Sequence, residues 1–410
     1  MTEQSTGMEF PTGVVEPDYD LWADDVNIDP TGVFADVDAA DNAWRAKARK
    51  FILDEVKADI HEYWDKAEYP LHLIKKLGEL DLLRDGLNLD SHEKMSPLAA
   101  GLVNMEMARG DGSVATIVGV QGGLAVRSVL YCGSPEQIQK YGLPMLAGEL
   151  PGAFALTEPT HGSDSVSLET RATKVEGGYR ISGEKKWIGN GSIGGVSIVW
   201  ARDDEGKVRG FVVRQDAEGY SATTIANKLS LRAIWQAHIR MENVFVPDED
   251  VLPEATSFKD TSRVLFATRL GVAWSAVGHA TACYESAVNY AKQRVQFGRP
   301  LAASQIVQER LARMQSELAS IQVLVMQATK RETTGELTGP QASLAKYTAT
   351  RTARAIASNA RDLLGGNGIL TSNRVARHFA DIEAIHTYEG TETVQALIMG
   401  RDITGISAFA

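Results

Sequence analysis

A long apolar stripe in the C-terminal third of the chain limits its fold more than any other feature. Between residues 307 and 328, apolar residues recur with alternating gaps of four and three, a mean spacing of 3.5 over 22 positions. Such a stripe lies on one face of a helix and is typical of long antiparallel helices in a bundle. Its members are Val307, Leu311, Met314, Leu318, Ile321, Val325 and Ala328.

The hydrophobic period changes twice along the chain. Helical spacing prevails up to about residue 150, alternation with β-branched residues follows, and helical spacing then returns. In the last zone, Pro340 stands at the first turn of a further helix that ends at Gly365-Gly366. This order predicts an α+β fold: a helical N-terminal domain, a middle antiparallel β domain and a C-terminal four-helix bundle. The predicted boundaries are an acidic extension at 1–35, then domains at 36–150, 151–255 and 256–410.

Composition excludes several classes of protein. The 410 residues include 42 Lys and Arg and 53 Asp and Glu, a net charge of −11, which argues against a nucleic-acid partner. Cys132 and Cys283 form no CxxC pair and no metal-ligand spacing, so we expect no metal site and a reducing compartment. No secretory signal, apolar run of 18 residues or C-terminal peroxisomal address is visible, which predicts a cytoplasmic protein with no membrane span.

Common enzyme signatures are missing, but several unusual segments occur in a fixed order. The sequence has no GxSxG, no GxxxxGK[ST] and no HExxH, and its glycine-rich tetrapeptide at 365–368 would by itself fit a helix end. The segments are LTEP with HGSD at 156–164, GEKKWIGN at 183–190, RVQFG at 294–298, LGGNG at 364–368 and YEGT at 388–391.

Together these segments resemble the acyl-CoA dehydrogenase family of flavoproteins, from about residue 40 to the C-terminus. The resemblance implies the same three domains, bound FAD and a homotetramer. Residues 386–391 and 400–406 are most similar to the glutaryl-CoA dehydrogenase branch and to the short-chain acyl-CoA oxidase of plant peroxisomes. Residues 246–250 and 257–262 resemble the plant oxidase in particular.

The implied reaction removes two hydrogens across Cα–Cβ of an acyl-CoA and gives the trans-2-enoyl-CoA. A thioester α-proton is weakly acidic, so the reaction needs a positioned base and stabilisation of the developing enolate. Glu389 matches the family base, and it can act only if burial raises its pKa. The resemblance also implies that flavin N5 takes the β-hydride, and that the Glu389 N–H and a flavin hydroxyl hold the thioester oxygen.

The resemblance assigns further residues to the cofactor and the substrate. Trp187 matches a residue packed on the flavin ring, although a core aromatic is the ordinary alternative, and Arg294 matches a phosphate-binding arginine that reaches across a subunit interface. The remaining cofactor residues are Thr157, Gly189, Phe297, Asp362, Gly365, Gly366, Thr391 and Thr393. Substrate-binding residues are Ser163 at the pantetheine, Arg269 at the CoA end, and Tyr388 and Gly390 at the acyl pocket, where plain packing is an equal alternative for Tyr388.

Two departures from the family pattern bear on specificity. Most dehydrogenases have a threonine that bonds flavin N5 at this point of the motif, whereas this sequence has Gly189 and in this resembles the plant oxidase. The electron acceptor is therefore either an electron-transfer flavoprotein or O2, which would be reduced to H2O2. Ala115 stands where glutaryl-CoA enzymes carry an arginine for the distal carboxylate. An unpaired carboxylate in an acyl pocket costs several kcal/mol, so we expect a neutral, short acyl chain rather than decarboxylation of glutaryl-CoA.

Three functions follow from the sequence. The first is an FAD-dependent acyl-CoA dehydrogenase, and the second is an acyl-CoA oxidase on the same scaffold. The third is a non-catalytic flavin-binding or DNA-associated relative. The net charge of −11 and the intact YEGT segment argue against the third.

Overall fold

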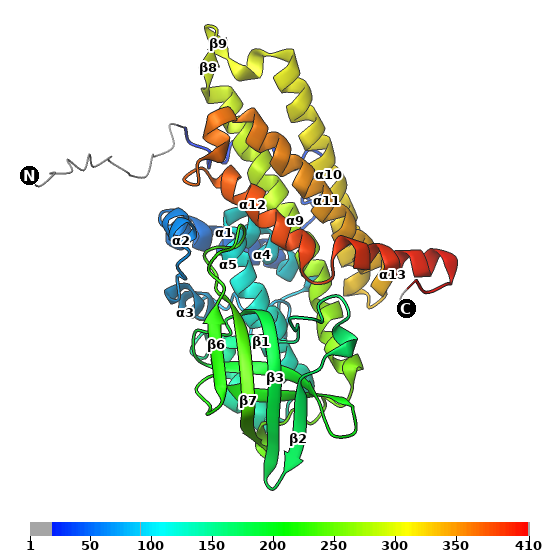
Figure 1. Ribbon diagram of the computed structural model, residues 1–410. Coiled ribbons are helices and arrows are strands. Elements are labelled where there is room, and N and C mark those ends of the chain that lie inside the picture. Colours follow the sequence, from blue (N-terminus) through cyan, green and yellow to red (C-terminus); the bar gives the residue numbers. More distant parts are fainter. Residues whose placement is uncertain (1–18, 91, 409–410) are drawn as a thin grey trace, which may run out of the picture.

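The computed structural model describes residues 19–90 and 92–408. A bundle of long helices lies over a twisted sheet, and the N-terminal helices pack along both (Figure 1). The predicted α+β architecture is therefore confirmed, and the four-helix bundle consists of α9 to α12. Part of the predicted acidic extension, residues 1–18, lies outside the described residues.

The N-terminal region consists of short helices with well-defined caps. Ser96 accepts a hydrogen bond from Ala99 N and precedes a proline, and Asp111 accepts bonds from Ser113 N and Val114 N. A π-helical turn, Ile52–Val56, directly follows the first helix. The helices are α1 Ala39–Phe51, α2 Ile60–Lys66, α3 His72–Glu79, α4 Pro97–Gly110, α5 Gly112–Val118, α6 Arg127–Cys132, α7 Pro135–Gln137 and α8 Leu143–Leu146.

One helical stretch in the described chain, Gly112–Cys132, is long and apolar enough to span a membrane. In its most apolar window, 78% of the residues are buried inside the protein, as in the core helix of a globular domain. Its apolar character is thus explained by packing against the rest of the chain.

The middle region is a seven-stranded sheet in the order β1-β4-β2-β3-β7-β6, with β5 paired to β4. The predicted antiparallel pairing dominates, while β4 pairs in parallel with β1 and with β2. The long pair β3 and β7 carries a bulge between Lys186 and Ile188. The strands are β1 Gly152–Ala155, β2 Arg171–Val175, β3 Gly178–Gly189, β4 Val196–Arg202, β5 Val208–Arg214, β6 Tyr220–Thr224 and β7 Gln236–Pro247.

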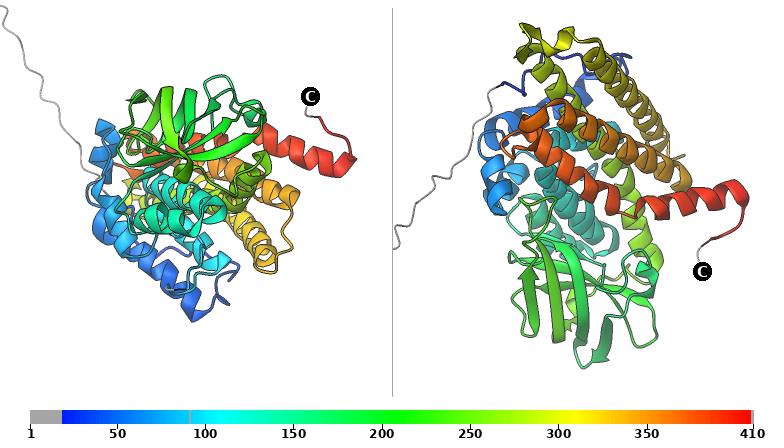
Figure 2. Two further views of the ribbon diagram at one scale, coloured as in Figure 1. Left: turned by 90° about the horizontal axis from the view of Figure 1, so that it is seen from below. Right: turned by 45° about the horizontal axis from the view of Figure 1, so that its top comes forward.

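The predicted apolar stripe lies on α10, and its central residues are fully buried. Pro340 does stand in the first turn of α11, which Thr338 and Gln341 cap reciprocally. The last helix, α13, extends away from the bundle (Figure 2). The bounds are α9 Phe258–Gln293, β8 Val295–Gln296, β9 Arg299–Pro300, α10 Gln305–Thr333, α11 Gly339–Leu363, α12 Arg374–Thr387 and α13 Glu392–Thr404.

Residues 19–37, here called the N-terminal strap, cross the bundle before α1 begins. Backbone carbonyls of the strap accept hydrogen bonds from bundle side chains: Leu21 O from Ser286 Oγ at 3.3 Å, and Ala23 O from Asn289 Nδ2 at 2.9 Å. The Leu21 and Phe34 side chains are buried in the main core. The strap is therefore an integral part of the fold.

Candidate active site

Glu389 lies in a tight turn, residues 388–390, that joins α12 to α13. Its φ is 55° and that of Gly390 is 87°, so a glutamate occupies the left-handed region. For a residue other than glycine this conformation costs about 1–3 kcal/mol and persists only where neighbours impose it. The neighbours here are Lys346 Nζ, which donates to the carbonyls of Tyr388 and Gly390, and Gln395 Nε2, which donates to Glu389 O at 2.9 Å.

Burial of the Glu389 carboxyl raises its pKa, and Arg269, Lys346 and the Thr268 hydroxyl oppose that rise. The Oε1 atom is buried, and no described residue forms a hydrogen bond with it. A buried carboxylate with an open coordination position and a raised pKa is suited to accept a proton. This is the environment that the sequence analysis required of a catalytic base.

Lys346 is a residue of this cluster that the sequence analysis missed, as is Gln395. Lys346 lies on α11, its side chain is 1% exposed, and burial lowers its pKa to about 7 although Glu389 favours its charged form. The one signal in the sequence is a lysine among the small residues Ala342, Ala345 and Ala349 on a buried helix face. That signal gives no partner, because Tyr388 is 42 positions away.

Two predicted substrate residues join this cluster. Arg269 interacts with Glu389, donates to Ser343 Oγ at 3.5 Å, and has a buried Nε with no hydrogen-bond partner in the described chain. Tyr388 is bonded to Thr116, and its burial raises the pKa of the phenol. The structure therefore brings Arg269, Tyr388, Glu389 and Gly390 together as predicted.

The predicted flavin-ring residues lie at the bulge in β3. Trp187 has a φ of 66° and is 55% exposed, because the bulge turns its side chain out of the sheet. Thr157 O accepts a hydrogen bond from Lys186 N at 2.8 Å, which places Thr157 beside the bulge. A Cβ at Gly189 would lie 2.8 Å from Val120 Cγ2, so Val120 fills the space that a threonine at position 189 would need.

A second group of predicted residues lines a surface cavity of about 430 Å³ at the far end of the bundle. Arg294, Gly365 and Gly366 meet there, and both glycines face open space where a side chain would stand. Arg294 Nη1 donates to the Tyr19 phenol of the strap at 2.9 Å. The cavity combines a cation with accessible backbone, as a phosphate group requires.

Profiles of three domains match the chain. They describe the acyl-CoA dehydrogenase N-terminal domain over residues 38–149, the middle domain over 153–244 and the C-terminal domain over 258–404. An acyl-CoA dehydrogenase of Bacillus subtilis (strain 168) is 34% identical over 88% of this chain and 97% of its own length. The chain belongs to the acyl-CoA dehydrogenase family.

Solved structures support the same assignment. A glutaryl-CoA dehydrogenase from Mycobacterium smegmatis is similar with a TM-score of 0.90 and 38% identity, over 92% of this chain and 98% of its own. A glutaryl-CoA dehydrogenase from the same organism, solved in complex with FADH2, has a TM-score of 0.89 and 33% identity, over 91% of this chain and 97% of its own. As a member of this family, the chain is an oxidoreductase of CH–CH groups that uses FAD.

The residues present fit FAD. An exposed tryptophan at a strand bulge offers a flat surface to an isoalloxazine ring, and the cavity with Arg294 and two open glycines suits a pyrophosphate. Thr391 accepts a bond from Val394 N as the N-cap of α13, so its hydroxyl hydrogen stays free to donate.

Four predicted site residues lie outside the Glu389 turn, the β3 bulge and the Arg294 cavity of the same chain. Phe297 is fully exposed beside the β8–β9 hairpin, and Ser163 and Thr393 are also exposed. Asp362 is exposed and forms ion pairs with Arg310 and Arg361. Their roles remain predictions.

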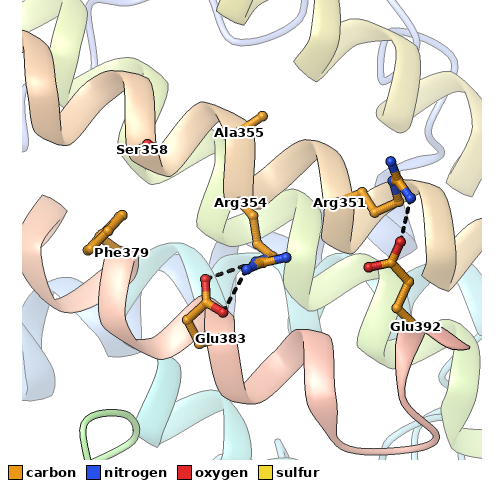
Figure 3. A pocket seen from close by; sticks show the side chains of 7 residues that line it. All are labelled: Arg351, Arg354, Ala355, Ser358, Phe379, Glu383 and Glu392. Atoms are coloured by element: carbon orange, nitrogen blue, oxygen red, sulfur yellow. Dashed lines mark hydrogen bonds and ion pairs between the residues drawn. The ribbon is translucent and has the colours of Figure 1, made fainter.

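Another surface cavity, of about 480 Å³, lies between α11, α12 and the start of α13. Its arginines are neutralised, since Arg354 forms two bonds to Glu383 at 2.8 and 2.9 Å and Arg351 pairs with Glu392 (Figure 3). Glu389 does not line it. This cavity therefore takes no part in the candidate active site.

Proposed function

We propose that this acyl-CoA dehydrogenase removes two hydrogens across Cα–Cβ of a short, neutral acyl-CoA to give the trans-2-enoyl-CoA. The observation that carries the proposal is Glu389, a buried carboxyl with a raised pKa and an oxygen, Oε1, with which no described residue forms a hydrogen bond. Such a group is poised to remove a weakly acidic α-proton.

The residues around Glu389 divide the work of the proton transfer. Glu389 takes the α-proton on its carboxylate, while its own backbone N–H is available to the thioester oxygen. Arg269 and Lys346 lie close enough to favour the carboxylate form before the reaction. When bound, FAD supplies the two-electron redox chemistry by accepting a hydride.

A neutral acyl chain is supported by the state of the nearby arginines. Arg109 is paired with Glu285 and Glu106, all three of them buried, and the buried Arg127 is paired with Asp85. Ala115, where glutaryl-CoA enzymes have an arginine, is buried and apolar. Neither arginine is free to pair with a carboxylate at the far end of an acyl chain. Burying such a carboxylate without a partner would cost several kcal/mol.

The electron acceptor and the assembly are further parts of the proposal. We propose an electron-transfer flavoprotein as the acceptor, with O2 as the alternative because of Gly189, and a cytoplasmic location. The β8–β9 hairpin next to Arg294 lies at the end of the bundle remote from the sheet, and strand β3 of that sheet carries Trp187 (Figure 1). The two groups of predicted cofactor residues thus lie in different parts of the chain, which supports the predicted homotetramer, in which two chains would share each FAD.

An anaerobic titration tests the proposal directly. Purified protein with bound FAD is titrated with butyryl-CoA while the flavin absorbance is followed, and air is then admitted. We expect bleaching that persists in air, whereas rapid reversal with H2O2 would indicate the oxidase. Absence of bleaching with butyryl-CoA and with longer or branched neutral acyl-CoAs would overturn the proposal, and bleaching with glutaryl-CoA alone would overturn the neutral chain.

A further inference from the structure

We propose that Lys346 is a positioning residue that orients and polarises the Tyr388–Glu389 peptide, so that the Glu389 N–H becomes a strong hydrogen-bond donor to the thioester oxygen. This inference rests on the proposed function. It assigns a role to a side chain that donates hydrogen bonds to backbone carbonyls, and it rests on three features of the turn at residues 388–390.

The first feature is the direction of the peptide. In a planar trans peptide the C=O and the N–H point in opposite directions. Lys346 Nζ donates to Tyr388 O, which belongs to the same peptide unit as the Glu389 N–H. The ammonium therefore fixes the N–H so that it points away from α11. Among residues 19–90 and 92–408, none accepts a hydrogen bond from this N–H.

The second feature is polarisation. A hydrogen bond to the carbonyl withdraws charge from the amide, and consecutive bonds in a dry site strengthen one another by roughly 10–30% each. A charged donor has a larger effect than a neutral one. The Lys346 side chain is 1% exposed and Glu389 favours its charged form, so water does not screen the charge at the peptide when Lys346 is protonated. The N–H opposite it becomes a better donor to an oxygen that gains negative charge.

The third feature is the conformation of Glu389, which is left-handed at a φ of 55°. Two side chains hold the turn in place. They share the Gly390 carbonyl as a partner and differ in the second carbonyl that each one binds. Lys346 binds Tyr388 O and Gly390 O, whereas Gln395 binds Glu389 O at 2.9 Å and Gly390 O at 3.2 Å. Only Lys346 acts on the peptide that carries the Glu389 N–H. Gln395 thus provides a matched control on the same turn.

The test is infrared spectroscopy of the FAD-loaded enzyme with crotonyl-CoA that carries ¹³C at the thioester carbonyl. A stronger hydrogen bond lowers the stretching frequency of this carbonyl, and a merely structural residue would not set that frequency. We expect a clear downshift in the wild-type enzyme, loss of most of it in Lys346→Met, and retention of it in Gln395→Met. In parallel, flavin reduction by butyryl-CoA should slow roughly 10- to 100-fold in Lys346→Met.

The outcomes separate this inference from the proposed function. A full downshift in folded Lys346→Met, or an equal loss in both variants, would overturn the role of Lys346 while leaving Glu389 as the base. If Lys346→Met fails to fold, Lys346→Gln is measured in the same way, and a downshift equal to that of the wild type overturns the proposal. A wild-type enzyme that neither binds crotonyl-CoA nor is reduced by any acyl-CoA would instead contradict the proposed function itself.

Discussion

Glu285 in α9 and Glu389 after α12 are glutamates with buried carboxyl oxygens, yet their surroundings differ. Glu285 Oε2 accepts a bond from Arg109 Nε at 2.9 Å, and its Oε1 is bonded to Arg374. Arg269 and Lys346 act on the charge of Glu389 without forming an ion pair with its carboxylate, and Glu389 Oε1 has no hydrogen-bond partner among the described residues. Full pairing makes Glu285 part of the framework, whereas incomplete pairing leaves Glu389 ready for a proton.

The N-terminal strap links the Glu285 network to the predicted pyrophosphate cavity. Asp24 of the strap pairs with Arg109, and so extends the Glu285 network to the surface. At its other end the strap places the Tyr19 phenol on Arg294 beside the predicted pyrophosphate cavity. The comparison therefore predicts that changes at Glu389 act on chemistry, that changes at Glu285 act on stability, and that changes in the strap act weakly on cofactor binding.

The largest expected effect is on activity. Glu389→Gln keeps the size of the side chain but removes the base, so flavin reduction by acyl-CoA should fall by roughly 10²- to 10⁴-fold. The rate is measured anaerobically by stopped flow at saturating substrate. Glu383→Gln, at an ion pair on the surface of α12, is the matched control and should stay within a few-fold. A Glu389→Gln rate within threefold of the wild type would reject Glu389 as the base.

The next effect is on stability. Glu285→Gln leaves Arg374 buried without a full counter-charge, although burial already lowers the pKa of Arg374 to about 10. Breaking such a pair costs about 3–5 kcal/mol of the free energy of unfolding, which denaturant titration can measure. Glu309→Gln, in the exposed pair with Arg313, should leave the unfolding midpoint unchanged. An unchanged midpoint for Glu285→Gln would remove the distinction drawn between the two glutamates.

The pH dependence of stability gives a third prediction. Because burial raises the pKa of Glu389 in the folded state, the folded protein holds this proton more tightly than the unfolded chain. Wild-type stability therefore declines relative to Glu389→Gln as pH rises above about 4.5, and the difference levels off above the folded-state pKa. Thermal unfolding midpoints of both proteins at several pH values between 4 and 8 test the sign. A difference that shrinks with rising pH would contradict the raised pKa.

The smallest effect concerns the strap. Tyr19→Phe removes one hydrogen bond to Arg294, worth about 0.5–1.5 kcal/mol, so FAD should dissociate roughly 2- to 10-fold more readily. Flavin fluorescence during reconstitution of the apoprotein measures this constant. Tyr347→Phe, which removes a similar phenol from Arg351 at 2.8 Å, is the control and should not change FAD affinity. If Tyr19→Phe and the wild type bind FAD with equal affinity, the strap does not contribute to cofactor binding.

Much of the fold and part of the site could be predicted from the sequence. The 3.5-residue stripe of α10 and the alternation in the middle region arise from local periodicity, which is why those elements were confirmed. Arg269 and Glu389 were expected in one site through the family motifs, and they do lie together. Lys346 and Gln395 were missed, since their partners are backbone carbonyls of a turn that no side-chain pattern reveals.

The amino-acid sequence by itself determined the order of helix, sheet and helix, the family, and the glutamate that we propose as the base. Only the tertiary structure decided how the pKa of that carboxyl is shifted. The pKa of Glu389 depends on burial and on cations from two other helices, and its left-handed backbone is held by Lys346 and Gln395. Hydrophobic periodicity is a property of residues that are close in sequence. The desolvation of a carboxyl and the charges that act on it arise only when distant segments of the chain come together.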